Sequence, residues 1–181
     1  MIITAIPAGF AAGLFGIGGG LITVPILFYI FTRAGIDPSY VMHLSVGTSF
    51  GIIIPTSIVS VLTHHQHKAV DFKVVRGFGL SVVTGVILGT ILAANLSTKP
   101  LILYFTIVVY GLAFYLLFLK EKSENLDIKI GLLAKTLAGI VSGFVSAPMG
   151  IGGAVMNVPI LKYFGYPINK AIGSAAAIGF I

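Results

Sequence analysis

The sequence predicts an all-α polytopic membrane protein, an internally duplicated helical bundle with broken helices at two glycine-rich motifs. Three observations lead to this fold class: an apolar composition, apolar runs long enough to cross a bilayer, and a glycine–proline motif that occurs twice. Of the 181 residues, 57% are hydrophobic and 9% are charged, whereas soluble domains carry about 25% charged residues. Only helices and closed barrels satisfy their own backbone in lipid, and the alternation typical of barrel strands is absent from the sequence.

Six apolar segments are predicted to be helical. They are Ile2–Phe31, Val41–Thr63, Val74–Asn95, Pro100–Leu119, Leu132–Phe164 and a last segment that begins near Asn169 and reaches Ile181. Two charge-free runs within them have lengths of 22 and 19 residues, and a bilayer core about 30 Å thick needs roughly 20 helical residues. The first segment has no basic start and is too long for the core of a cleaved signal peptide.

The internal repeat is carried by "GIGGGLITVPIL", Gly16–Leu27, and "GIGGAVMNVPIL", Gly150–Leu161. Eight of the twelve positions match, and "VGTS" further on corresponds to "IGSA" after a slip in register. We therefore expect a first membrane repeat over residues 1–119 with about four apolar segments, a polar cytoplasmic link over 120–130, and the start of a second repeat over 131–181. Because the last segment stops inside an apolar run, we expect the intact protein to extend further.

The orientation in the membrane follows from the basic residues between the apolar segments. The richest links contain Lys68, Lys73 and Arg76, and then Lys120, Lys122, Lys129 and Lys135. The positive-inside rule places both links in the cytoplasm. Two arrangements fit these charges: parallel repeats if the first segment crosses once, and inverted repeats if it is a re-entrant pair of half-helices.

The glycines and prolines are expected to break helices in order to bind a ligand. Glycine costs about 1 kcal/mol and proline about 3 kcal/mol in a helix interior, so a matched pair of such breaks requires a function. We expect a new helix to begin at Thr23 and at Asn157, which would act as N-caps, with Pro25 and Pro159 in the first turn. Two such helix N-termini near the membrane midplane would form an anion site. The alternative is that the glycines only allow close helix packing.

The predicted substrate site combines the glycine segments with small polar residues of the helices that follow them. Its members are Gly16, Gly18, Gly19, Gly20, Thr23, Pro25, Gly47, Thr48, Ser49, Gly150, Gly152, Gly153, Asn157, Pro159 and Ser174. The hydroxyls of Thr48, Ser49 and Ser174 would either donate to an oxyanion or bond to carbonyls of their own helices. The expected partners are a small anion and the lipid bilayer.

Other functions find little support in the sequence. The chain has no cysteine, which removes disulfides and thiol chemistry. The cluster His64, His65 and His67 has only Asp71 as a nearby carboxylate, so no metal site or cofactor is predicted. The net charge of +6 comes from basic residues spread over the links, which indicates lipid contact and orientation rather than nucleic-acid binding.

Three alternatives stay open at this point. His43 and Lys170 stand at the starts of corresponding segments, where they would either attract anions or extend to the membrane interface. An intramembrane enzyme using His43 or the histidine cluster would lack a nucleophile and an acid within the membrane. A membrane scaffold that transports nothing would have no need of helix breaks. A homo-oligomer is also open.

"GLFGIGGGLITVPIL", its repeat "GIGGAVMNVPIL" and the "GTS" at Gly47–Ser49 resemble the sulfite exporter TauE/SafE family, also called the sulfonate uptake permease superfamily. The resemblance implies a bacterial or archaeal inner-membrane permease, usually with seven or eight helices. It also implies transport of small sulfur-containing anions such as sulfite, sulfonates or sulfoacetate. The chain departs from its own first copy at Ala154, which replaces Gly20, and at "GSA", which replaces a second "GTS".

Overall fold

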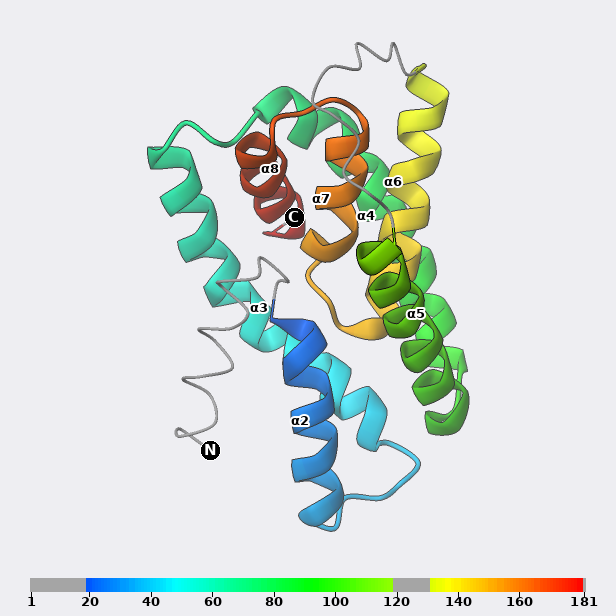
Figure 1. Ribbon diagram of the computed structural model, residues 1–181. Coiled ribbons are helices and arrows are strands. Elements are labelled where there is room, and N and C mark those ends of the chain that lie inside the picture. The colour runs from blue at the N-terminus through cyan, green and yellow to red at the C-terminus, as the bar shows by residue number, and fades with distance from the viewer. Residues whose placement is uncertain (1–18, 119–130, 181) are drawn as a thin grey trace.

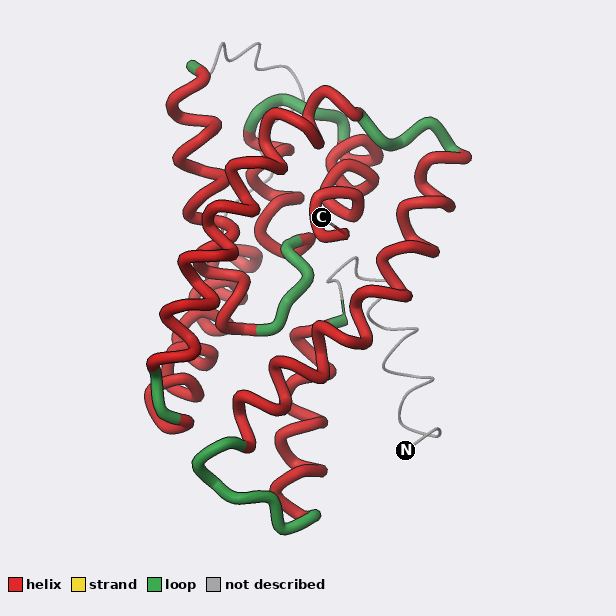
Figure 2. Tube along the Cα trace, turned by 180° about the vertical axis from the view of Figure 1, so that it is seen from behind, coloured by secondary structure: helices red, strands yellow, loops and turns green. Residues whose placement is uncertain are grey.

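Helices make up all of the regular structure in the described part of the chain (Figures 1 and 2). The computed structural model describes residues 19–118 and 131–180. Within these ranges the elements are α2 (Gly20–Arg33), α3 (Val41–Gln66), α4 (Phe72–Asn95), α5 (Thr98–Phe118), α6 (Leu132–Ser146), the 3-10 turn η1 (Ala147–Met149), α7 (Ala154–Tyr163) and α8 (Ile168–Phe180). The predicted all-α membrane fold class is confirmed.

Within the described residues, four helical stretches are long and apolar enough to cross a membrane. They are Val41–Gln66, Phe72–Asn95, Thr98–Tyr115 and Leu132–Met149. Large apolar side chains project outward from them, including Leu80 on α4 and Ile107 and Phe114 on α5, which are 71%, 61% and 63% exposed. Water would disfavour such wide apolar faces, and acyl chains would not.

The closest helix pair is α4 with α6, and glycines make its contact possible. The contributing glycines are Gly85, Gly89, Gly139 and Gly143. A Cβ atom at Gly89 would lie 2.5 Å from the carbonyl oxygen of Phe144, and one at Gly139 would lie 2.7 Å from Ser81 Cβ. Small residues allow backbones to approach this closely in membranes. Since the contacting positions advance together along both helices, α4 and α6 run in the same direction.

The predicted segment Leu132–Phe164 is two helices separated by a reversal of the chain. After α6 and η1, residues 150–153 are not helical, and α7 begins at Ala154. Phe164, directly after α7, makes an edge-on contact with Phe78, with ring centroids 6.0 Å apart. A Cβ at Gly139 in α6 would also meet Phe78. Thus α7 runs back along α6 toward the end of the molecule where α6 began (Figure 1).

The two helices that carry the matching "VPIL" sequences start beside each other and run apart. A Cβ at Gly20, the first residue of α2, would lie 2.8 Å from Ile151 Cα in the segment before α7. From this meeting point α2 descends and α7 ascends in Figure 1. The two copies of the motif therefore have opposite directions.

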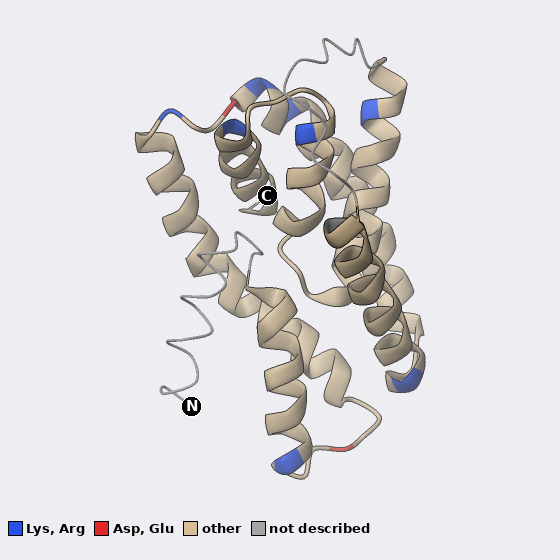
Figure 3. Ribbon diagram, in the orientation of Figure 1, with Lys and Arg blue, Asp and Glu red and all other residues tan. Residues whose placement is uncertain are grey.

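The charged residues gather at the two ends of the molecule (Figure 3). One end holds the α3–α4 link, the start of α6 and the α7–α8 link, with the residues Lys68, Lys73, Arg76, Lys135, Lys162 and Lys170. The opposite end holds Arg33, Asp37 and Lys99. Burial, with a smaller contribution from the Asp71 carboxylate, raises the pKa of Tyr166 in the α7–α8 link. The middle of the described helices is left without charged side chains.

Candidate substrate site

The two glycine motifs end in the same backbone conformation. Gly19 precedes α2 with φ 69° and ψ −42°, and Gly153 precedes α7 with φ 68° and ψ −22°. Residues with side chains rarely adopt positive φ, whereas glycine does so readily. A glycine immediately before each helix is therefore a backbone requirement, and it accounts for the recurrence of glycine at these two positions.

The predicted helix starts are wrong by three residues. Helix α2 begins at Gly20 rather than Thr23, and α7 begins at Ala154 rather than Asn157. The preceding glycine turns the chain directly into the helix, so no side-chain cap is made at either start. The Thr23 hydroxyl instead donates to the Gly19 carbonyl oxygen at 2.8 Å, which is a bond back along its own helix.

The prolines lie further from the helix starts than predicted. Pro25 and Pro159 lie inside α2 and α7, beyond the first turn. Each removes the donor that would normally bond the carbonyl four residues earlier. Pro159 also lines an apolar groove on the outside of α7.

The segment before α7 is packed tightly against α2 and α3. The Ser49 hydroxyl of α3 donates to the Gly150 carbonyl oxygen at 2.9 Å. Gly150 has φ 64°, and a Cβ there would lie 3.1 Å from Val24 Cγ2 and 3.2 Å from Val46 Cα. The first turns of α2 and α7 thus lie in one region of the protein interior. At the start of α7, the Gly153 and Ala154 N–H groups donate to the Ile151 and Gly152 carbonyl oxygens at 2.6 and 2.8 Å.

Asn157 is a fully buried polar side chain beside this region. It is 0% exposed, and its Oδ1 atom accepts a hydrogen bond from the Ser142 hydroxyl at 2.6 Å. Its Nδ2 atom is buried and has no hydrogen-bond partner within residues 19–118 and 131–180. That atom lies 3.0 Å from the position that a Cβ of Gly153 would occupy, so the amide group faces the start of α7.

Ser146 is a second buried polar group near this segment. It is the last residue of α6, and its hydroxyl makes no hydrogen bond to any residue that the structure describes. Its carbonyl oxygen accepts from the Ile151 N–H at 3.4 Å, which places Ser146 at the entrance of the non-helical segment. An unpaired buried polar group costs about 1–3 kcal/mol and is uncommon in native proteins.

The sequence reasoning missed Ser142 and Ser146. Their spacing of four residues puts both on one face of α6, which was the available signal. Nothing in the sequence indicated that this face would meet Asn157.

The other predicted site residues are dispersed. Ser174 accepts a hydrogen bond from the Asp71 N–H at 3.0 Å, so it lies toward the α3–α4 link and away from Gly150. A Cβ at Gly47 would touch nothing within 4 Å, and Thr48 is half-buried on α3. Gly152 is covered by Ile53 of α3 and by Gly179 of α8. Gly16 and Gly18 lie outside the described residues.

The histidines and Lys170 do not join this site. His43 Nε2 lies 3.2 Å from the Ala93 carbonyl oxygen, near the end of α4, while Lys170 lies in the first turn of α8 at the opposite end of the molecule. His67 Nδ1 is 2.8 Å from the Thr63 carbonyl oxygen. Among the residues that the structure describes, no group of three or more His, Cys, Asp or Glu side chains is placed to hold a metal ion.

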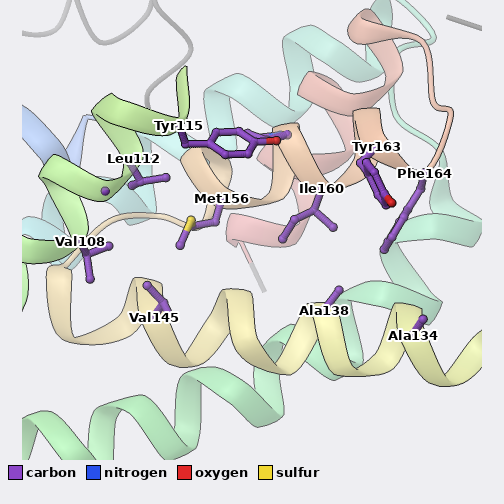
Figure 4. A pocket seen from close by; sticks show the side chains of 12 residues that line it. Val108, Leu112, Tyr115, Ala134, Ala138, Val145, Met156, Ile160, Tyr163 and Phe164 are labelled. Atoms are coloured by element: carbon purple, nitrogen blue, oxygen red, sulfur yellow. The ribbon is translucent and has the colours of Figure 1, made fainter. Parts of the chain in front are cut away.

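An apolar groove of about 760 Å³ runs between α5, α6 and α7 (Figure 4). Its lining includes Leu112, Tyr115, Ala138, Met156 and Ile160, and it does not include Asn157. Tyrosine hydroxyls are the polar side-chain groups of this lining. The groove therefore suits an apolar occupant and not a small anion.

The comparison with known families decides where this fold belongs. The family model described as "Sulfite exporter TauE/SafE" matches residues 1–181. The chain belongs to the TauE/SafE family. No solved structure matches it.

Relatives of this TauE/SafE chain are described as probable membrane transporter proteins. One from Haemophilus influenzae is 33% identical over 174 residues, covering 96% of this chain and 66% of the relative. One from Methanocaldococcus jannaschii is 32% identical over 187 residues, covering all of this chain and 67% of the relative. One from Bacillus subtilis is 24% identical over 201 residues. The chain thus spans about two thirds of the length of its first two relatives.

Family membership and the apolar helices agree on where the TauE/SafE chain resides. Its relatives are described as membrane transporters, and four of its described helical stretches are able to span a bilayer. The chain is a multi-pass membrane protein.

Proposed function

We propose that this TauE/SafE protein is a secondary permease for small sulfur-containing oxyanions such as sulfite, sulfonates or sulfoacetate. The observation that carries the proposal is the meeting of the α2 and α7 N-termini at Gly20 and the segment 150–153. A helix N-terminus behaves as roughly half a positive charge, and this dipole remains at α7, where the Gly153 and Ala154 N–H groups donate to the Ile151 and Gly152 carbonyl oxygens. Two of them directed at one place would bind an anion without a charged side chain.

The electrostatics around this place favour an anion over a cation. The charged residues of the described helices lie at the molecular ends (Figure 3). Two buried atoms next to the glycine segment, Asn157 Nδ2 and Ser146 Oγ, have no partner in the described part of the chain and are able to donate hydrogen bonds. A cation would be bound best by carboxylates, and the described ones, Asp37 and Asp71, lie in the links at the molecular ends. Neutral donors also let an anion leave again, as transport requires.

The directions of the helices suggest how transport would occur. We propose that residues 1–119 and 131–181 belong to two inverted repeats, because α2 and α7 point in opposite directions from their meeting point. The link 120–130 would lie in the cytoplasm. In transporters with inverted repeats, one repeat moves against the other around a site near the midplane. Non-helical backbone at such depth is tolerated where it lines a cavity or is buried in protein.

The rival functions have less support. An intramembrane enzyme would need a catalytic acid or nucleophile, and the ring of His43 bonds to the end of α4 instead of facing the glycine segment. A scaffold would need neither the helix reversal nor unpaired buried donors.

The test is sulfite flux into proteoliposomes that contain the purified protein. We expect saturable uptake of sulfite. Methanesulfonate should inhibit this uptake competitively, and choline should not inhibit it. If sulfite, methanesulfonate and sulfoacetate all fail to cross faster than into empty liposomes, the proposal is wrong.

A further inference from the structure

We infer that α6 and α7 form a side-chain subsite for the oxygen atoms of the anion, in which Asn157 Nδ2 and Ser146 Oγ donate and Ser142 orients Asn157. The inference rests on the proposed function. It adds Ser142 and Ser146 to the predicted site residue Asn157 and assigns each of the three side chains a role.

The orientation of Asn157 is set by one hydrogen bond. The Ser142 hydroxyl donates to Oδ1 at 2.6 Å, so the amide nitrogen points away from Ser142 with both of its N–H groups available. This nitrogen lies beside Gly153, the residue from which α7 starts. The amide nitrogen therefore faces the short non-helical segment that precedes α7. Ser142 is a positioning residue in this arrangement.

Burial distinguishes these donors from ordinary surface groups. Asn157, Ser142 and Ser146 are 0%, 1% and 3% exposed, yet Nδ2 of Asn157 and Oγ of Ser146 have no partner among the described residues. Asn157 lies after the non-helical segment and Ser146 lies before it. Buried polar groups in proteins are normally paired with protein or with ordered water, so an acceptor belongs here.

The chemistry of the donors defines the ligand. Both are neutral, and both need an acceptor oxygen. An oxyanion with two or more oxygens on one centre, such as sulfite or a sulfonate, has the acceptors that both donors need. A buried water molecule is the competing acceptor.

The most informative variant is Ser146→Ala, because an oxyanion and a buried water molecule as the acceptor for this hydroxyl predict different results. It removes an unpaired hydroxyl, so the unliganded protein should melt at the same temperature or higher. If the hydroxyl binds the anion, the KM for sulfite should rise about tenfold, the usual effect of losing one hydrogen bond to a charged group.

Two further variants test Asn157 and its orientation. Asn157→Asp keeps the shape and replaces the donor with an acceptor, so saturable sulfite uptake should be lost. Ser142→Ala should raise the KM, and Ser142→Thr, which keeps the hydroxyl, should restore it in part. The matched control is Ser45→Ala. Ser45 is equally buried, but its hydroxyl bonds to the Val41 carbonyl of its own helix at 2.7 Å, so the KM should not change.

The measurements are sulfite uptake in proteoliposomes and melting of the detergent-purified protein with and without sulfite. Ser146→Ala and Asn157→Asp variants with wild-type KM at normal abundance would overturn the subsite and assign both donors to buried water. If the wild type transports no sulfite, the effect of sulfite on the melting temperature still tests whether the subsite binds sulfite. Stabilisation by sulfite that Ser146→Ala abolishes would support the subsite and reject transport, whereas no stabilisation of the wild type would reject both.

Discussion

Ser49 on α3 and Gly150 before α7 are joined by a hydrogen bond of 2.9 Å between residues 101 positions apart in the chain. The hydroxyl donor follows the first glycine motif, and the carbonyl acceptor belongs to the second. The bond therefore holds the second glycine segment against the helices of the first motif. It lies where the α2 and α7 starts meet.

Removal of the hydrogen bond between Ser49 and Gly150 should weaken the packing of the segment before α7 against α3. We expect Ser49→Ala to lower the free energy of unfolding by about 1–3 kcal/mol, because the Gly150 carbonyl would be left buried without a donor. Sulfite uptake per molecule should fall as well. Thermal melting and flux measure the two effects, and Ser45→Ala is the control because its bond is within one helix. Equal melting temperatures for both variants would contradict this role of Ser49.

Side chains at the two helix starts should impair transport more than abundance. Gly19 and Gly153 have φ near +70°, a conformation that costs other residues about 1–2 kcal/mol. A Cβ at Gly153 would also approach Asn157 Nδ2 to 3.0 Å. We expect Gly153→Val and Gly19→Val to reach the membrane in reduced but measurable amounts and to transport poorly per molecule.

The control for these variants is Gly77→Ala in α4, where a Cβ would meet nothing within 4 Å. It should leave flux unchanged and raise stability by about 0.5–1 kcal/mol. Normal flux per molecule in Gly19→Val and Gly153→Val would mean that the helix starts serve packing alone.

Substitution of the glycines between α4 and α6 should reduce the amount of folded protein more than the flux per molecule. A Cβ at Gly85 would collide with the Ile140 carbonyl oxygen, and one at Gly143 with that of Val82. Backbone cannot move aside as a flexible side chain can, so Gly85→Val should sharply reduce the amount of folded protein. Any molecules that do fold should keep near-normal flux. Fluorescence size-exclusion chromatography of detergent extracts measures the yield, and a wild-type elution profile would contradict the prediction.

The basic end of the molecule should face the cytoplasm. The positive-inside rule assigns the α3–α4 link and the residues 120–130 to that side, and the link between α2 and α3 to the other. Because the chain has no cysteine, single cysteines report the side without background. We expect Ser39→Cys to react with an impermeant thiol reagent in intact cells, and Ser123→Cys to react only after lysis. The reverse pattern would invert the orientation.

The sequence alone determined those features that depend on neighbouring residues. Apolar runs predicted α3, α4 and α5 to within a few residues of their observed ends, because the transfer of a helix into lipid depends on the local sum of side-chain hydrophobicities. The repeated glycines and the prolines indicated an interruption before Pro159, and residues 150–153 are indeed not helical. The family was likewise readable from these motifs.

Only the tertiary structure decided where the helices restart and what they face. The restart at Ala154 depends on the positive φ of Gly153, and a propensity for N-capping at Asn157 could not reveal it. The partners Ser142 for Asn157 and Asp71 for Ser174 come from a chain reversal and from contacts between distant helices. Side-chain type states which hydrogen bonds a residue is able to make. Which of them it makes, and which stay open for a ligand, depends on the path of the chain through the membrane.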